Sequence, residues 1–348
     1  MSGDPFFTIL KYMEDVMELY DKKGWFNAPD VINDTAVFIF CTGARGTGKT
    51  YGVLKYLISS AMTFIYLRRT QEESDLQSKS ETSSLQKVID DLHLESSYLK
   101  IAKKIGHVEI SSGAHAYCCA LSTFASVRGV DFSDVKYIVY DEMIPEAHAH
   151  RIKHEGMALM NLYETVNRNR ELTGEDPVKF IGLSNSLNIA NDVFMEFKLI
   201  SSAEDMLQKQ EEIRRLGNKL LIIMQHSPIS DRKKETALYQ AASDDFVQMA
   251  IHNKFILNDF SYVKRRNLRE YKPYMQIGDL YVYDHKSSDD FYVSFSRCKT
   301  DQIYTSSLND LRRLRREQWA LYCDYLDGFV RFENYNAVAL FEKYFALV

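Results

Sequence analysis

The stretch Gly43-Ala44-Arg45-Gly46-Thr47-Gly48-Lys49-Thr50 matches the phosphate-binding pattern GxxxxGK[ST] at every defined position. An apolar run at residues 36–41 precedes it, and apolar residues recur at helical spacing across 53–58, so the order is strand, loop, helix. The glycines let the loop curl until backbone N–H groups and the positive end of the helix point at phosphate oxygens. This order predicts a nucleotide-binding α/β domain.

Several residues of the loop have expected roles. Lys49 brings a positive charge to the β- and γ-phosphates, and the Thr50 hydroxyl is placed to ligate Mg²⁺. ATP and Mg²⁺ are therefore the expected cofactors. Arg45 is placed to contact the γ-phosphate or a neighbouring subunit, and the alternative is simple exposure to solvent. The expected nucleotide-binding residues are Gly43, Ala44, Arg45, Gly46, Thr47, Gly48, Lys49, Thr50 and Tyr51.

A second apolar run, residues 135–140, ends in the acids Asp141 and Glu142. A buried parallel strand delivers its last residues to the edge where ligands bind, so Asp141 is predicted to hold Mg²⁺ opposite Thr50. Glu142 is then placed to activate the attacking water. The base-recognition motif NKxD of GTPases is absent from the sequence. The adjacent Asp–Glu pair favours a hydrolysing ATPase.

Three more residues are candidates for catalysis. Asn185 follows the apolar run 179–183, where an amide can sense the γ-phosphate or the water, although Asn is also an ordinary turn residue. Arg168 and Arg170 follow a helical pattern over 159–166. One of them is a candidate arginine finger acting on a neighbouring subunit, and the alternative is that both complement the end of a helix.

Other apolar runs lack polar alternation, which is typical of strands buried on both faces of a parallel sheet. These runs are residues 63–67, 179–183 and 220–224. A helix is predicted over 203–216, with Ser202 as its cap and Gly217 at its end. In a later segment, residues 280–283 and 291–295 alternate as two strands joined by 284–290.

The composition indicates a folded protein: the 348 residues are 45% hydrophobic and 26% charged. Its five cysteines form no CxxC pair, so they are interpreted as reduced thiols of an intracellular protein. No apolar run approaches the ~18 residues of a membrane span, so no membrane partner is expected. Because the net charge is −5, a nucleic-acid partner has to be met by a local basic patch.

The amino-acid composition changes near residue 227, where a charged connector leads into a tyrosine-rich segment. Residues 251–320 hold 13 Lys and Arg against 9 Asp and Glu. We therefore expect a P-loop ATPase domain over 1–226, a linker over 227–253 and a nucleic-acid-binding domain over 254–348. Two basic clusters are suited to phosphates, and the alternative is a solvated charged surface. Their residues are Lys264, Arg265, Arg266, Arg312, Arg313, Arg315 and Arg316.

Taken together, these features resemble the DNA-packaging ATPases of phi29-like tailed phages, relatives of the large terminases and the FtsK/HerA translocases. The resemblance rests on the phosphate loop and on residues 63–70, 126–129 leading into 135–142, 253–255 and 292–294. It implies an α/β P-loop NTPase of the ASCE type with a mainly parallel sheet. It also implies a smaller α+β C-terminal domain similar to an RNase H-type nuclease that has lost its catalytic acids.

Asp284, Asp289 and Asp290 lie in the expected hairpin connection without a spaced triad, so nucleic-acid binding without cleavage is expected. The resemblance implies an ATP-driven double-stranded DNA translocase that packages viral DNA through the portal of a procapsid. Such a motor is a homomeric ring, usually a pentamer, working in the host cytoplasm. Some members also use a structural RNA, and that partner stays open. The alternatives are a helicase or protein-remodelling ATPase, or a non-enzymatic adaptor with a nucleotide switch.

Overall fold

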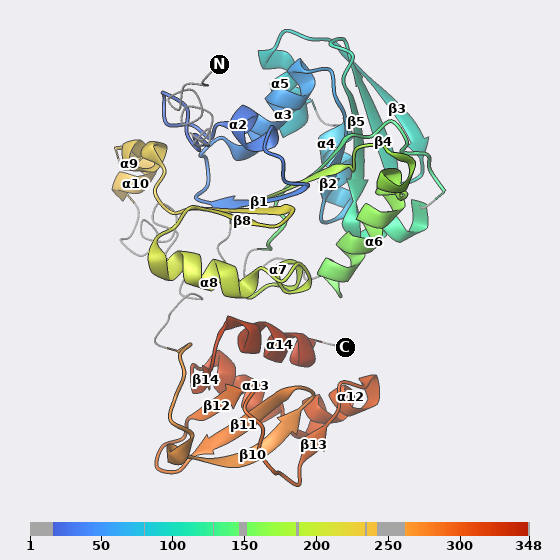
Figure 1. Ribbon diagram of the computed structural model, residues 1–348. Coiled ribbons are helices and arrows are strands. Elements are labelled where there is room, and N and C mark those ends of the chain that lie inside the picture. Colours follow the sequence, from blue (N-terminus) through green and yellow to red (C-terminus); the bar gives the residue numbers. More distant parts are fainter. Residues whose placement is uncertain are drawn as a thin grey trace, which may run out of the picture.

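The computed structural model describes residues 17–79, 81–127, 129–145, 152–185, 188–233, 235–241 and 262–346. The larger of the two sheets in these residues has nine strands in the order β3-β4-β5-β2-β6-β7-β1-β9-β8 (Figure 1). Its strands are β1 (Phe38–Gly43), β2 (Thr63–Arg68), β3 (Ser96–Ala102), β4 (Ile105–Ile110), β5 (His115–Ala120), β6 (Tyr137–Tyr140), β7 (Lys179–Ser184), β8 (Ile213–Leu216) and β9 (Lys219–Met224).

The six central strands, from β5 to β9 in spatial order, are parallel, and helices cover both faces of the sheet. One face carries α2 (Ala28–Ile32), α3 (Lys49–Ser59), α4 (Gln71–Lys79) and α5 (Ser84–Asp91); the other carries α6 (Glu155–Asn167), α7 (Asp192–Glu196) and α8 (Ile200–Lys209). Because both faces are covered, every residue of β1 after Phe38 is buried. The predicted α/β fold class with a mainly parallel sheet is confirmed.

The strands predicted at 36–41, 63–67, 135–140, 179–183 and 220–224 correspond to β1, β2, β6, β7 and β9. One strand, β7, lies between the strand of the phosphate loop and the strand of the acids.

The helix predicted over 203–216 is wrong in its second half. Helix α8 ends at Lys209, and Ile213–Leu216 forms β8, which pairs antiparallel with β9. Gly217, at φ +64°, turns this hairpin instead of ending a helix. The pairing with β9 outweighs the helical pattern, because it satisfies the backbone groups of β8 along one side.

The second sheet has five strands in the order β13-β10-β11-β12-β14. They are β10 (Tyr271–Ile277), β11 (Leu280–His285), β12 (Phe291–Ser294), β13 (Ile303–Tyr304) and β14 (Val330–Phe332). Helices α12 (Leu308–Glu317), α13 (Trp319–Leu326) and α14 (Tyr335–Ala346) accompany it. This is the expected smaller α+β unit, and β11 and β12 are the two predicted alternating strands. Residues 253–255 and Arg128, used in the resemblance, lie outside the described residues.

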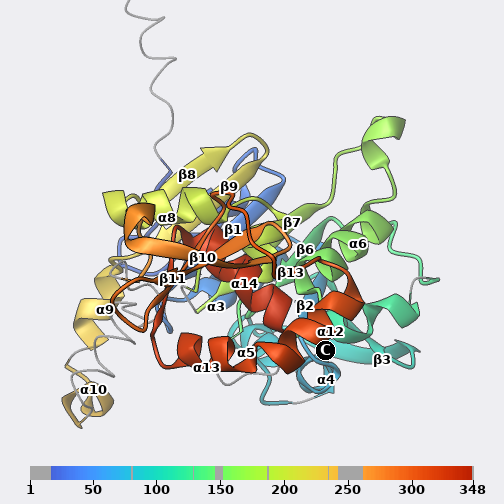
Figure 2. The ribbon, with the colours of Figure 1, turned by 90° about the horizontal axis from the view of Figure 1, so that it is seen from below.

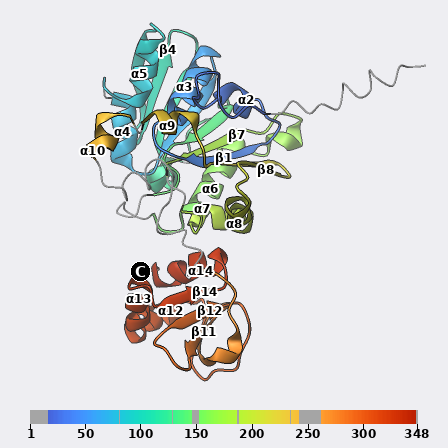
Figure 3. The ribbon, with the colours of Figure 1, turned by 90° about the vertical axis from the view of Figure 1, so that its left-hand side faces the viewer.

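Helix α14 joins the two units. It lies between the second sheet and helices α7 and α8 of the first (Figures 1 and 3), and the view from below in Figure 2 looks through the second sheet toward the first. Lys343 of α14 forms ion pairs with Glu196 (3.0 Å) and Asp192 (3.3 Å) of α7. Asn336 donates a hydrogen bond of 2.8 Å to Ser201 of α8. No helix in the described part of the chain is long and apolar enough to cross a membrane.

Candidate nucleotide and magnesium site

The phosphate loop connects the end of β1 to the start of α3. Gly46 and Gly48 adopt φ values of +63° and +89°, which glycine takes up without strain. Helix α3 begins at Lys49, directly after this turn. The loop is thus shaped as the sequence predicted, with a helix N-terminus and its free N–H groups at the carboxyl edge of the sheet.

Lys49 is the buried cation of the loop, with 4% of its surface exposed. Its Nζ donates hydrogen bonds to the carbonyl oxygens of Gly43 (3.0 Å) and Ala44 (2.8 Å), and lies 3.3 Å from Thr47 Oγ1. Burial lowers the pKa of Lys49 to about 8. An anion bound in the loop would restore the charged form, which is what a phosphate-binding lysine requires.

Thr50 and Asp141 meet at the same edge of the sheet. Thr50 Oγ1 donates a hydrogen bond of 2.8 Å to Asp141 Oδ1, although the two residues are 91 positions apart. Tyr66 donates to the other carboxylate oxygen, Oδ2, also at 2.8 Å. A hydroxyl and a carboxylate oxygen side by side are the hard donors that Mg²⁺ takes in nucleotide sites. The residues present therefore fit the expected magnesium ion.

Arg68, the last residue of β2, was given no role by the sequence analysis. Its guanidinium donates to Asp141 Oδ2 (2.7 Å) and to Glu142 Oε2 (3.0 Å). Burial alone would lower the pKa of Arg68, but Asp141 and the other nearby acids raise it overall. In the sequence, the only indication of such a role is that Arg68 directly follows the apolar run 63–67. Glu142 is held in this pair with φ +56°, an uncommon conformation for a non-glycine residue.

The structure separates the two arginines that the sequence left equivalent. Arg170 is buried, and its guanidinium donates to the carbonyl oxygens of Val135 (2.7 Å), Phe132 (3.1 Å) and Ser133 (3.0 Å). In this conformation Arg170 holds the chain before β6 in place and is not available to a neighbouring subunit. The Arg168 side chain is 50% exposed, and its contact with Asp131, at 3.5 Å, is long.

Asn185 follows β7 and is partly buried. Because β7 lies between β6 and β1, Asn185 follows the strand that separates the acids from the phosphate loop. Arg45 is exposed on the loop. Tyr51 lies one helical position beyond Thr50, and partial burial and a hydrogen bond to Asp91 of α5 raise its pKa.

Two elements beside the loop were not anticipated. Phe26 donates its backbone N–H to the Thr47 carbonyl (3.0 Å). The Trp25 ring lies close to Gly48, because a Cβ built on this glycine would be 3.3 Å from the ring. From the other side, Lys233 at the end of α9 (Pro228–Lys233) donates a hydrogen bond to the Arg45 carbonyl. The sequence by itself shows Lys233 only as one charge of the connector that follows residue 227.

The two basic clusters of the C-terminal unit lie at opposite edges of its sheet. Val263 bridges to Phe332 of β14, which places Lys264, Arg265 and Arg266 at that edge. Helix α12 instead packs beside β13, where Arg313 donates to the Ile303 carbonyl (2.8 Å). The seven predicted residues therefore form two surfaces. On α12, Arg312 and Arg316 are exposed and Arg315 is partly buried.

The three aspartates of the hairpin do not gather into one acidic site. Asp284, at the end of β11, forms an ion pair with Lys272 (2.9 Å), and Asp290 faces Arg331 (3.6 Å). Asp289 lies between them in the connection to β12.

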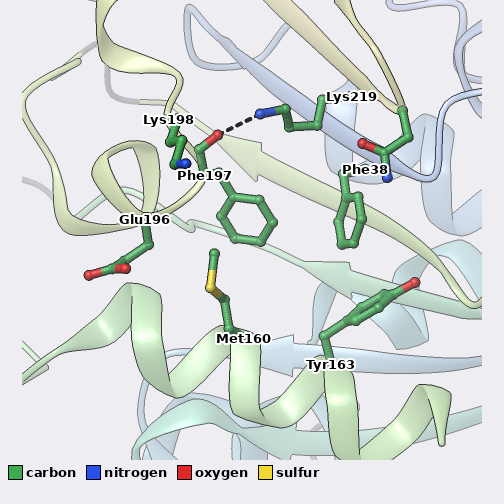
Figure 4. Close-up of a pocket in the computed structure, with 8 residues that line it drawn as sticks. Phe38, Met160, Tyr163, Glu196, Phe197, Lys198 and Lys219 are labelled. Atoms are coloured by element: carbon green, nitrogen blue, oxygen red, sulfur yellow. Dashed lines mark hydrogen bonds between the residues drawn. The ribbon is translucent and has the colours of Figure 1, made fainter. Parts of the chain in front are cut away.

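A pocket of about 370 Å³ lies at the other end of the large sheet (Figure 4). Phe38 and Lys219, the first residues of β1 and β9, line it together with Met160 and Tyr163 of α6. Lys219 donates to the Phe197 carbonyl (2.8 Å) at its rim. Since the phosphate loop lies at the opposite end of β1 from Phe38, this apolar pocket is separate from the candidate nucleotide site.

Comparison with known proteins gives consistent matches. The model of the podovirus DNA encapsidation protein (Gp16) family matches residues 20–337. The DNA packaging proteins of Bacillus phages PZA and phi29 are each 25% identical over 253 residues, covering 71% of this chain and 70% of the relative. The Phi-28 gp11 DNA packaging motor superposes with a TM-score of 0.60 at 16% identity, covering 94% of this chain and 99% of the other. The packaging motor assembly of bacteriophage Phi-29 gives 0.59 at 21%, covering 92% and 99%.

Proposed function

Because the chain belongs to the podovirus DNA encapsidation protein (Gp16) family, we propose that it is an ATP-driven translocase that packages double-stranded viral DNA into a procapsid through the portal. The relatives named as DNA packaging proteins support this function. The observation that carries it is the hydrogen bond between Thr50 and Asp141, because it joins the phosphate loop to the acid strand at one point.

In this proposal the loop residues, from Gly43 to Tyr51, bind ATP, and Lys49 neutralises charge on the phosphate chain. Thr50 and Asp141 hold Mg²⁺, which supplies charge stabilisation on the phosphate oxygens when bound. Glu142 accepts a proton from the attacking water, and Asn185 orients that water or the γ-phosphate.

Arg68 sets a condition on this chemistry. Its guanidinium occupies Oε2 of Glu142, so the other carboxylate oxygen, Oε1, is the one that accepts a proton from the attacking water. The half-exposed Glu142 side chain, with 51% of its surface accessible, leaves room for that water.

The ring belongs to the same proposal. Arg168 acts on the nucleotide of a neighbouring subunit in a homomeric ring, which we take to be a pentamer on the portal in the host cytoplasm. Exposed arginines of the C-terminal unit contact DNA phosphates. We also propose the division into an ATPase domain (1–226), a linker (227–253) and a DNA-binding domain (254–348). A structural RNA is an additional candidate partner of the ring.

The test is packaging itself. Purified protein, empty procapsids carrying their portal, ATP and genome-length duplex DNA are mixed, and nuclease is added. We expect ATP-dependent protection of full-length DNA, and no protection with ADP or with the Lys49→Ala variant. Hydrolysis without protection would overturn the packaging function.

The alternatives predict different stimulation of the ATPase. Duplex DNA should stimulate a packaging motor, single-stranded DNA a helicase, and neither a protein-remodelling ring. Absence of hydrolysis with every partner present would instead support the non-enzymatic adaptor.

A further inference from the structure

Lys233 lies directly over the phosphate loop. Strand β9 pairs in parallel with β1 and ends with Met224 beside Gly43, so the chain that follows leaves the sheet next to the loop. Helix α9 then places Lys233 next to the loop, where the Nζ of this lysine donates a hydrogen bond to the Arg45 carbonyl. A Cβ built on Gly46 would clash with this Nζ. The ammonium group therefore occupies the space that the missing side chain of Gly46 leaves open.

Packing at the start of α9 fixes this position. Ile229 is 4% exposed, and a Cβ on Gly24 would lie 2.9 Å from Pro228 Cβ, so α9 is pressed against the segment that contains Gly24. Two residues further on, that segment bonds to the loop through Phe26 and Thr47. The segment from Gly24 to Phe26 thus contacts both the helix that carries Lys233 and the phosphate loop.

The positive charges of Lys49 and Lys233 beside the loop favour binding of an anion. Lys49 Nζ donates to the Ala44 carbonyl and Lys233 Nζ donates to the next carbonyl, that of Arg45, so two ammonium groups lie beside the loop. Burial also lowers the pKa of Lys233. Within the part of the chain that the structure describes, no carboxylate forms an ion pair with Lys233. Its hydrogen-bond partner is a neutral carbonyl, and a phosphate oxygen is a stronger acceptor for an ammonium group.

We propose that Lys233 is a second phosphate-binding lysine, which contacts the phosphate chain of the ATP held by the loop of its own subunit. This inference rests on the proposed ATPase function. Since α9 is the first helix after the large sheet on the way to the C-terminal unit, the contact also makes the start of that connection sensitive to whether phosphate is bound.

The test compares the affinity of the full-length protein for a fluorescent ATP analogue by anisotropy. Lys233→Gln should weaken binding about tenfold, the loss of one charge-assisted hydrogen bond. Lys233→Arg should retain most of the affinity. Arg232→Gln is the matched control, because this neighbour is exposed, and it should bind like the unmodified protein.

The thermal unfolding temperature of each variant distinguishes a loss of phosphate binding from a loss of stability of the loop. Affinity unchanged or tightened in Lys233→Gln would overturn the inference, whether or not stability falls. A loss of affinity that Lys233→Arg does not restore would also overturn it, because the positive charge would then not be the cause. Lys49→Ala tests the underlying site: if it abolishes binding while Lys233→Gln does not, only this inference fails. If neither variant affects binding, the proposed ATPase site itself fails.

Discussion

The Thr50 hydroxyl donates a hydrogen bond of 2.8 Å to the Asp141 carboxylate, so the phosphate loop and the acid strand meet at one point. Strand β7 separates their two strands in the sheet, and the contact forms because all three strands are parallel and end at one edge. The two oxygens are already adjacent, so one ion can replace the shared proton with little rearrangement.

The magnesium requirement should depend on the Thr50 hydroxyl. In Thr50→Val the shape of the side chain is retained but one hard oxygen donor is lost. The Mg²⁺ concentration that gives half-maximal ATP hydrolysis should rise about tenfold, while nucleotide binding in the presence of EDTA stays unchanged. A magnesium titration of the ATPase checks this, and an unaltered midpoint would remove Thr50 from the ion's ligands.

Glu142→Gln should separate binding from turnover. The amide oxygen still accepts from Arg68, so ATP should bind, but hydrolysis should fall at least about 100-fold because the general base is lost. Glu73→Gln is a suitable control, since Glu73 Oε2 also lies near Arg68, at 3.7 Å, outside the acid pair. Steady-state turnover and ATP affinity of both variants are measured. Comparable losses in the two would argue against a special role for Glu142.

Nucleotide affinity should fall above pH 8. The pKa of Lys49 is about 8 in the free protein, so below this pH the cation is already present. At higher pH the protein has to take up a proton to bind phosphate, and affinity should drop by up to about tenfold per pH unit. Binding measured at pH 7.5 and 9.5, with proton uptake from calorimetry in two buffers, tests this. Lys49→Arg, which stays charged, should show a flat profile; an equal slope there would assign the effect to another group.

Alanine substitutions of Arg168 and Arg170 should change the free energy of unfolding by different amounts. Arg170→Ala leaves three carbonyl groups near β6 without their donor and should cost at least about 2 kcal/mol in the free energy of unfolding. Arg168→Ala should cost less than about 0.5 kcal/mol, because the side chain is half exposed. Denaturant unfolding compares the two variants.

Arg168→Ala combined with Lys49→Ala tests action between subunits. Arg168→Ala should lose ATPase activity while it still binds ATP and assembles. Mixing it with Lys49→Ala subunits should restore part of the activity, since a Lys49→Ala subunit still supplies its Arg168 to the intact nucleotide site of an Arg168→Ala neighbour. Absence of any recovery in mixed rings would contradict a role in trans.

The exposed arginines of α12 should contribute to the salt dependence of DNA binding. Arg312→Gln together with Arg316→Gln should lower the slope of log affinity against log salt by up to about 2. Arg313→Gln is expected to act differently, because its guanidinium lies 4.8 Å from the Tyr304 ring centre and donates to Ile303. That variant should lose about 1 kcal/mol of stability. A slope unchanged in the double variant would mean that these arginines are only a solvated surface.

The geometry of the candidate nucleotide site was largely predictable because its parts are local. The loop requires glycines at fixed positions followed by a helix, and the acids directly follow a buried strand, so each pattern by itself spans only a few neighbouring residues. The residues that were missed act across long separations. Arg68 is identified only by its two carboxylate partners, and Lys233 by a carbonyl 188 positions away.

Local pattern also misled where tertiary pairing decided the outcome. Residues 213–216 carry a helical pattern, yet β9 offered their backbone a hydrogen-bonding partner. By itself the sequence determined the fold class, the phosphate loop and the acid pair, since each depends on neighbouring residues. Only the tertiary structure decided which arginine is exposed, which edge each basic cluster occupies and which lysine reaches the loop, because burial and hydrogen-bond partners depend on distant segments brought together.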